Sequence, residues 1–107
     1  MRVFGLKSCD TCRRALQQIR AAGHVPQVID LRDDGMSQSD LQLVLSRFGD
    51  AAINRASTTW RGLTDAERAQ DTGTLLAAFP TLFKRPVIEN AGVWTMGWAP
   101  AVQVQVL

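Results

Sequence analysis

Cys9 and Cys12 are the only cysteines in the chain, and their Cys-x-x-Cys spacing is the pattern best suited to chemistry. They follow a short apolar run, residues 3–6, and open a helical pattern. Backbone N–H groups and the helix dipole at a helix start both stabilise a thiolate. Because the thiolate is the nucleophile, thiol chemistry is the leading hypothesis, with Cys9 as the attacking sulfur. The alternative for Cys9 is a buried structural cysteine.

Cys12 has two interpretations. One helical turn after Cys9, it can meet the first sulfur and resolve a mixed disulfide. It also shares a helix face with Ala15 and Leu16, so it can instead be a small residue of the buried stripe. We expect no metal site, because the cysteine pair and the lone His24 cannot supply four protein ligands. His24 follows a glycine that ends the helix and is expected in a surface loop.

Length and composition narrow the class of protein. A chain of 107 residues with 46% hydrophobic residues is expected to form one domain, residues 1–107. The net charge of +2, with both signs mixed, favours neither nucleic acid nor an anionic membrane as partner. No apolar run reaches the roughly 18 residues of a membrane span, and no signal peptide is recognisable. Two close cysteines do not form a secreted disulfide framework, so we expect a cytoplasmic protein.

The hydrophobic pattern predicts a strand, a helix and a second strand in the first third of the chain. Residues 2–6 are the first expected strand and residues 25–31 the second. Between them an apolar helix face ends at Gly23; its members are Cys12, Ala15, Leu16, Ile19 and Ala22. This order implies a parallel pair of strands joined by a helical crossover.

Helices and a hairpin are expected in the remainder. Ser37 is a helix start, and Gly49 ends that helix. Thr64 and Glu67 form a capping box, and a helical period then continues to Pro80. Residues 87–97 predict a hairpin with its turn at residues 90–92. The tail is open, because Pro100 suits the first turn of a helix while the valines at 102, 104 and 106 alternate as in a strand.

The whole order predicts an α/β protein with a thioredoxin-like fold. A mixed β-sheet is flanked by helices, and the helical stretch from about residue 37 to residue 83 is an insertion before the C-terminal hairpin. The Cys-x-x-Cys at the first strand–helix junction supports this prediction.

Three local segments occur in a characteristic order: residues 3–11 (VFGLKSCDT), 54–61 (NRASTTWR) and 84–89 (KRPVIE). In these segments the chain resembles the glutaredoxin-linked arsenate reductase family, which also contains the Spx-type transcription regulators. The nearest subgroup is the small arsenate-reductase-like thiol proteins. The resemblance implies a thioredoxin-like sheet with a helical insertion, Cys9 as nucleophile, Arg85 near its sulfur, and a cis bond between Arg85 and Pro86.

The resemblance and the residue types together suggest the site. The guanidinium of Arg85 can hold an oxyanion or a carboxylate bidentately and lower the pKa of a nearby thiol, although it can also be a solvated arginine. A cis Pro86 exposes main-chain groups to a thiol partner. Thr11 can donate a hydrogen bond to the sulfur or to a bound oxyanion. Arg55, or Asn54 beside it, is the candidate for a second anion contact.

One position departs from the family pattern. The enzymes place an arginine directly before a proline near the end of the hairpin, and this chain has Ala99 before Pro100. The oxyanion cage therefore lacks one arginine. Lys7 is either a source of positive potential beside Cys9 or a solvated charge, and Trp98 either packs or borders the site.

The leading functional hypothesis is a thiol-dependent oxidoreductase of arsenate-reductase type. Cys9 attacks an oxyanion or a disulfide, and Cys12 or glutathione resolves the adduct. No cofactor is tightly bound, and glutathione with glutaredoxin, or thioredoxin, supplies electrons. One alternative is an Spx-like redox sensor that binds RNA polymerase. The other is a glutathione-binding relative without turnover.

Overall fold

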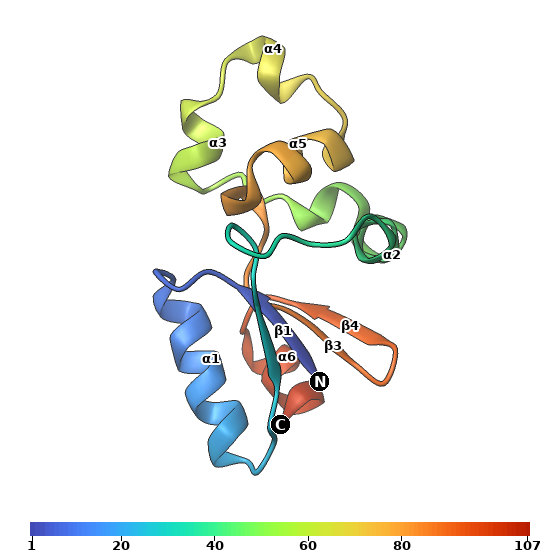
Figure 1. The fold of residues 1–107 in the computed structure, drawn as a ribbon. Helices are drawn as coiled ribbons and strands as arrows, with labels where there is room; N and C mark the ends of the chain where they lie inside the picture. Colours follow the sequence, from blue (N-terminus) through green and yellow to red (C-terminus); the bar gives the residue numbers. More distant parts are fainter.

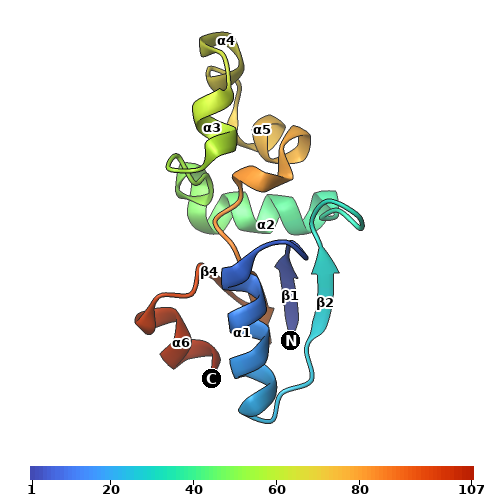
Figure 2. The ribbon, with the colours of Figure 1, turned by 90° about the vertical axis from the view of Figure 1, so that its left-hand side faces the viewer.

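The computed structural model describes all 107 residues and contains one mixed four-stranded sheet in the order β2-β1-β3-β4. β1 runs parallel to β2 and antiparallel to β3, and β3 pairs with β4 as a hairpin. Helix α1 connects β1 to β2, as the sequence predicts (Figures 1 and 2). The bounds are β1 Arg2–Gly5, α1 Asp10–Ala21, β2 Gln27–Asp30, β3 Val87–Asn90, β4 Val93–Met96 and a final helix, α6, Pro100–Val106.

The predicted helical insertion is confirmed. It lies at the end of the molecule toward which β1 points, and the whole structure is 45 Å long and 26 Å across (Figure 1). None of the helices is both long and apolar enough to span a bilayer. The insertion consists of α2 Gln38–Phe48, η1 Gly49–Ala52, α3 Thr58–Gly62, α4 Asp65–Arg68, α5 Thr72–Ala78 and η2 Pro80–Leu82.

Alternation along β1 directs neighbouring side chains to two cores. Val3 and Ile88 face α1 and α6, where they pack with Ile19 and Val106. Phe4 points to the opposite face and joins the larger core, which includes α2 and the rest of the insertion. The end of β1 is therefore fixed between the two layers, and the loop that follows it carries Cys9.

The start and stop signals read from the sequence are confirmed at several positions. Ser37 caps α2 by accepting from the Asp40 N–H, and Thr64 and Glu67 form the capping box of α4. The hairpin turns through two residues, Ala91 and Gly92, both with positive φ. That is the geometry of a two-residue turn that follows the right-handed twist of the strands.

Two boundaries differ from the prediction, and the helical period expected from Thr64 to Pro80 is interrupted at residues 69–71, which separate α4 from α5. The second strand begins at Gln27 rather than at residue 25, because Pro26 has no N–H to donate to the ladder. The tail, left open by the sequence, is a helix that starts at Pro100. Val102 and Val106 lie one turn apart and pack on the sheet, while Val104 is 83% exposed. The alternation of valines is thus compatible with a helix that buries only two of them.

Arg2 ties the sheet to the insertion. Its guanidinium binds the Asp40 carboxylate on α2 at 2.6 Å and the Glu89 carboxylate on β3 at 3.3 Å. It also lies over the rings of Phe4 and Trp94, which stack on each other. The hydrogen bond from Arg2 holds the pKa of Asp40 below its ordinary value.

Asp40→Asn should lower the free energy of unfolding at pH 7 by about 1–2 kcal/mol, since a charge-assisted hydrogen bond is lost. Because the folded-state pKa of Asp40 is depressed, its contribution is complete above the unfolded pKa of about 3.9 and disappears as pH falls through the folded value. Urea unfolding of wild type and variant at pH 7 and pH 3 measures this. Asp65→Asn, which removes a fully exposed partner of Arg68, should change stability by less than about 0.5 kcal/mol. A difference that is the same at both pH values would contradict the assignment.

Candidate active site

Cys9 is the residue that caps α1. Its backbone is extended, with φ −91° and ψ 115°, and helical geometry starts at Asp10. Its N–H donates to the Leu6 carbonyl at 3.1 Å, which closes a tight turn between β1 and the helix. The thiol is free and half-buried. The cysteine therefore stands where the unpaired N–H groups of the first helical turn point outward.

The surroundings of Cys9 favour its thiolate. Burial by itself raises the pKa of Cys9, but the Cys12 backbone N–H, the Arg85 guanidinium and the Cys12 thiol together bring that pKa below its ordinary value. As a neutral thiol Cys9 makes no capping hydrogen bond. Its anion, in contrast, takes the place of a capping oxygen and is stabilised by the N–H three residues along. These surroundings are compatible with the thiolate at Cys9 that the sequence predicts, which stays a prediction.

Cys12 is the opposite kind of thiol. It is buried at 3% exposure on the inner face of α1. Burial, together with the neighbouring Cys9 sulfur, raises the pKa of Cys12 to about 11. Both interpretations of Cys12 are compatible with this placement, since the residue packs in the buried stripe and also interacts with Cys9.

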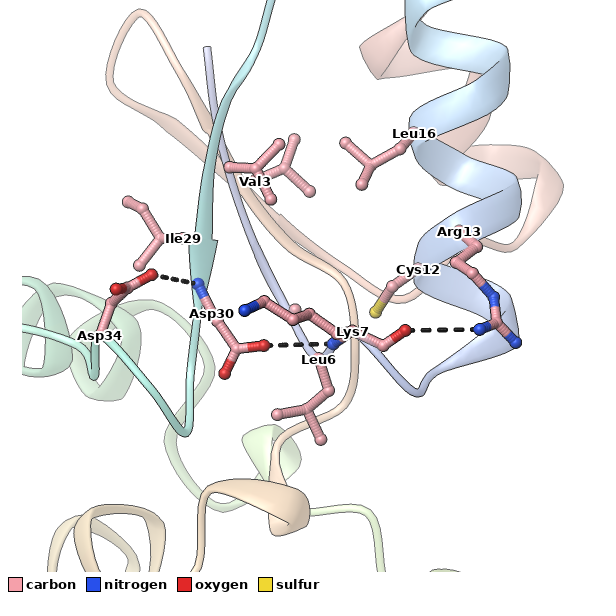
Figure 3. Close-up of a pocket in the computed structure, with 11 residues that line it drawn as sticks. Val3, Leu6, Lys7, Cys12, Arg13, Leu16, Ile29, Asp30 and Asp34 are labelled. Carbon is pink, nitrogen blue, oxygen red and sulfur yellow. Dashed lines mark hydrogen bonds between the residues drawn. The ribbon is translucent and has the colours of Figure 1, made fainter.

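Gly5 makes room for Cys12. A Cβ on Gly5 would stand 2.8 Å from the Cys12 sulfur and 3.2 Å from its Cβ, closer than side chains pack. Glycine is therefore required at the end of β1 by the approach of the helix and not by its φ angle. The same sulfur borders an apolar cavity of about 300 Å³ between α1 and the sheet (Figure 3).

Arg85 brings the positive charge. One terminal nitrogen of its guanidinium donates to the Thr81 carbonyl at 2.7 Å. Its Nε is buried and has no hydrogen-bond partner in the structure. An unpartnered buried donor on a cation is costly unless an anion accepts from it. The Cys9 thiolate, or an anion bound beside it, would be such an acceptor.

The insertion positions Arg85 beside the start of α1. Phe83 forms a bridge with Ile53, and the Lys84 N–H donates to Ala52 at 2.9 Å, so this segment is attached to η1. The hydroxyls of Thr59 and Thr81 are 2.6 Å apart, which links α3 to η2. The Arg85–Pro86 bond is cis, as the resemblance implies, and Pro86 is fully buried.

Other residues named from the sequence lie apart from this group. The Arg55 guanidinium lies over the Trp60 ring and donates to the Asp50 carbonyl, and it is not among the groups that shift the pKa of Cys9. Thr11 is partly exposed in the first turn of α1. Ala99 caps α6. The structure thus brings together Cys9, Cys12 and Arg85, with Pro86 next to Arg85 in the chain.

Three further side chains have definite partners. Trp98 donates to Gln18 on α1 at 2.6 Å, so it packs against the helix that carries both cysteines. Lys7 pairs with Asp33. Asp10 lies inside α1 and pairs with Arg13 rather than capping the helix.

Sequence reasoning missed two contributors, Gly5 and Thr81. Gly5 ends a strand next to a Cys-x-x-Cys, which is a signal for close approach of a helix to the sheet. Thr81 contributes through its backbone carbonyl, and no residue type signals such a role. No group of three His, Cys, Asp or Glu side chains is arranged to hold a metal ion.

The amino-acid sequence and the fold of this chain are similar to those of known proteins. The ArsC family matches residues 4–104. The chain belongs to the ArsC family. The thioredoxin-like fold of that family is therefore the fold of this protein, as its sheet and flanking helices predict.

Three individual proteins resemble the chain over most of its length. An uncharacterized protein of Haemophilus influenzae is 36% identical over 101 residues, which is 90% of this chain and 89% of that one. The solved structure of a YffB protein has 28% identity and a TM-score of 0.87, with 99% and 97% of the two chains covered. An arsenate reductase (ArsC) related protein from Brucella melitensis has 30% identity and a TM-score of 0.74, with 94% and 88% covered.

Arg85→Ala should raise the pKa of Cys9, because the variant loses the guanidinium that stabilises the thiolate. The rate of Cys9 alkylation against pH, followed by mass spectrometry in a Cys12→Ser background, gives this pKa. At pH values below both pKa values we expect slower alkylation, because the thiolate fraction falls about tenfold for each pKa unit gained, an effect only partly offset by the greater nucleophilicity of the more basic thiolate. Lys84→Ala removes an adjacent exposed charge and Arg55→Ala removes the charge that lies over Trp60, and neither should shift the profile. Equal effects of all three variants would refute a specific role for Arg85.

Gly5→Ala should destabilise the fold by about 1–3 kcal/mol, the usual effect of overpacking, because the new methyl group meets the Cys12 side chain. Thermal and urea unfolding measure the loss. In the double variant with Cys12→Ala the sulfur contact is gone, so the loss should be smaller than the sum of the two single effects. Strict additivity would show that the two residues do not compete for space.

Proposed function

We propose that this protein is a thiol-dependent reductase of arsenate-reductase type, with Cys9 as its nucleophile. The observation that carries the proposal is the meeting of the Cys9 sulfur with the start of α1 and with Arg85, whose buried Nε has no partner. These groups stabilise the same negative charge, on the thiolate before attack and on a bound anion during it. Membership of the ArsC family supports the same chemistry.

The proposed reaction on an oxyanion balances as follows. The Cys9 thiolate attacks As(V) and displaces a hydroxyl group, which leaves as water after protonation. A second thiol then attacks the Cys9 sulfur, a disulfide forms, and arsenic leaves with the bonding electron pair as As(III). On a mixed disulfide, the Cys9 thiolate instead displaces one thiolate and keeps the other sulfur in a new disulfide.

Either Cys12 or an external thiol such as glutathione can be the second thiol. With the Cys9 anion beside it, Cys12 stays protonated, because its pKa is about 11. Once Cys9 is bound in an adduct, its charge is gone and one cause of that high pKa disappears. Cys12 then needs only to overcome its burial, so we propose that it resolves adducts after Cys9 has reacted and does not compete with it before.

The small number of positive charges beside Cys9 limits the choice of substrate. Ala99 stands where the arsenate reductases of the family carry an arginine, and Arg55 is turned onto Trp60. Arg85 is then the guanidinium beside Cys9, and it can pair with a single carboxylate or with one edge of an oxyanion. This favours a mixed disulfide of a small carboxylate-bearing thiol, such as glutathione, over arsenate.

A second function rests on the cysteine pair alone. Two free thiols one turn apart can form a disulfide that changes the start of α1, as a redox-sensing regulator that binds RNA polymerase requires. Binding of the polymerase α subunit only by the oxidised protein would favour this function. Glutathione binding without any turnover would favour the other alternative, a family member that binds glutathione but is not an enzyme.

Turnover of arsenate and of a glutathione mixed disulfide, with glutathione and glutaredoxin or with thioredoxin as donor, tests the proposal. Cys9→Ser should reduce either activity to background. Cys12→Ser should accumulate a Cys9 adduct visible in the intact mass, if Cys12 is the resolving thiol. His24→Ala changes a partly buried residue after the end of α1 opposite Cys9, so it serves as the control and should keep full activity. Activity that survives in Cys9→Ser would exclude the proposed nucleophile.

A further inference from the structure

The loop that leads into Cys9 is held by a side chain from another strand. Asp30, the last residue of β2, is buried. One carboxylate oxygen accepts from the Lys7 N–H at 3.1 Å (Figure 3). The other accepts from the Arg32 and Asp33 N–H groups at 2.8 Å each. The Asp30 side chain thus accepts from two N–H groups in the turn after β2 and from one N–H group in the loop after β1.

Packing holds the two ends of the loop, since Leu6 is buried in the larger core and Cys9 packs against that core. Between these ends, the cavity of about 300 Å³ lies on the inner side of the loop, bordered by Leu6, Lys7 and Cys12. The side chains of Lys7 and Ser8 are exposed. The carbonyl of Lys7 accepts only a long hydrogen bond, 3.4 Å, from the exposed Arg13 guanidinium. Apart from the burial of Leu6 just before it, the Lys7 backbone is therefore held mainly by the shorter, less exposed bond from its N–H to Asp30.

Movement of Lys7 would move the nucleophile. Cys9 follows two residues later, and its own N–H is bonded to Leu6 in the same turn. The stabilisation of its thiolate depends on short-range contacts with the Cys12 N–H and with Arg85. Such contacts weaken steeply with displacement, and a shift of about 1 Å is enough to lose much of their effect.

We propose that Asp30 is a positioning residue for Cys9. It fixes the Lys7 N–H through its carboxylate and thereby holds the Cys9 sulfur at the start of α1, opposite Arg85. The inference deepens the proposed function, since it rests on Cys9 being the nucleophile. The direction of the change in the Cys9 pKa distinguishes positioning from a purely electrostatic effect of Asp30. Because a negative charge near Cys9 opposes the thiolate, loss of that charge alone would lower the pKa of Cys9. Loss of positioning would raise the pKa of Cys9.

Asp30→Asn tests this with a side chain of the same shape. The single amide oxygen of asparagine accepts from the Arg32 and Asp33 N–H groups. The amide NH₂ then faces the Lys7 N–H, and because both groups are donors the hydrogen bond to Lys7 is lost. We expect faster hydrogen exchange at the Lys7 amide and a rise in the pKa of Cys9, which is measured as slower Cys9 alkylation at pH values below that pKa. Asp33→Asn is the matched control: it removes the carboxylate 3.1 Å from the Lys7 ammonium but leaves the backbone contact, and should change neither readout.

Each outcome decides the matter. A Cys9 pKa that stays unchanged or falls in Asp30→Asn, while the Lys7 amide exchanges freely, overturns the proposal. If Asp30→Asn does not fold, Asp30→Ser, whose hydroxyl accepts within the turn but does not reach Lys7, must give the same rise. Neither readout needs a substrate. A wild-type protein without turnover but with an Asp30-dependent Cys9 pKa would therefore reject the proposed function and leave the positioning role intact.

Discussion

The candidate site depends on one interaction between distant parts of the chain, the placement of the Arg85 charge against the sulfur at the start of α1. Arg85 is a cation with a buried donor that has no partner. Holding it there without an acceptor is unfavourable, so the surrounding structure must impose the geometry. The insertion does this through the bridge of Ile53 to Phe83, the Thr59–Thr81 hydroxyl pair and the carbonyl of Thr81. The insertion is thus part of the site's construction and not an appendage to the sheet.

The two cysteines differ in burial, and this gives their thiols different pKa values. Cys9 is only half-buried, so backbone N–H groups and Arg85 outweigh desolvation and its thiolate is favoured. Cys12 lies one turn deeper against Gly5, where the same helix gives it no comparable compensation and its pKa is about 11. Two identical side chains therefore have one lowered and one raised pKa, a difference that the proposed sequence of attack by Cys9 and resolution by Cys12 would use.

Local features of the sequence were sufficient for the elements and for Cys9. Apolar periodicity, caps and turn residues depend on neighbours in the chain, so the strand–helix junction at Cys9 and the hairpin followed from them. The valine alternation of the tail was ambiguous because a helix can bury Val102 and Val106 and expose Val104. Only the docking of the tail on the sheet distinguishes the two.

The other parts of the site depend on contacts between residues that are distant in the sequence, so local sequence patterns could not predict them. Arg85 was reached through the family resemblance, since nothing near it in sequence indicates a distant thiol. Arg55 was a reasonable anion contact by residue type, yet the aromatic ring of Trp60 is where its guanidinium lies. The hydrogen bond of Asp30 to Lys7 joins two loops whose proximity follows only from the pairing of β1 with β2.

The most direct measurement is a pH titration of the wild-type protein labelled with ¹³C at the cysteine Cβ, followed by NMR. Because the Cβ shift reports thiolate formation, both thiols are observed separately without any variant or reagent. The account predicts that the Cys9 signal titrates below the free-cysteine value of about 8.5 and that the Cys12 signal titrates near 11. Two signals that titrate together near 8.5, or a Cys12 that ionises first, would contradict it.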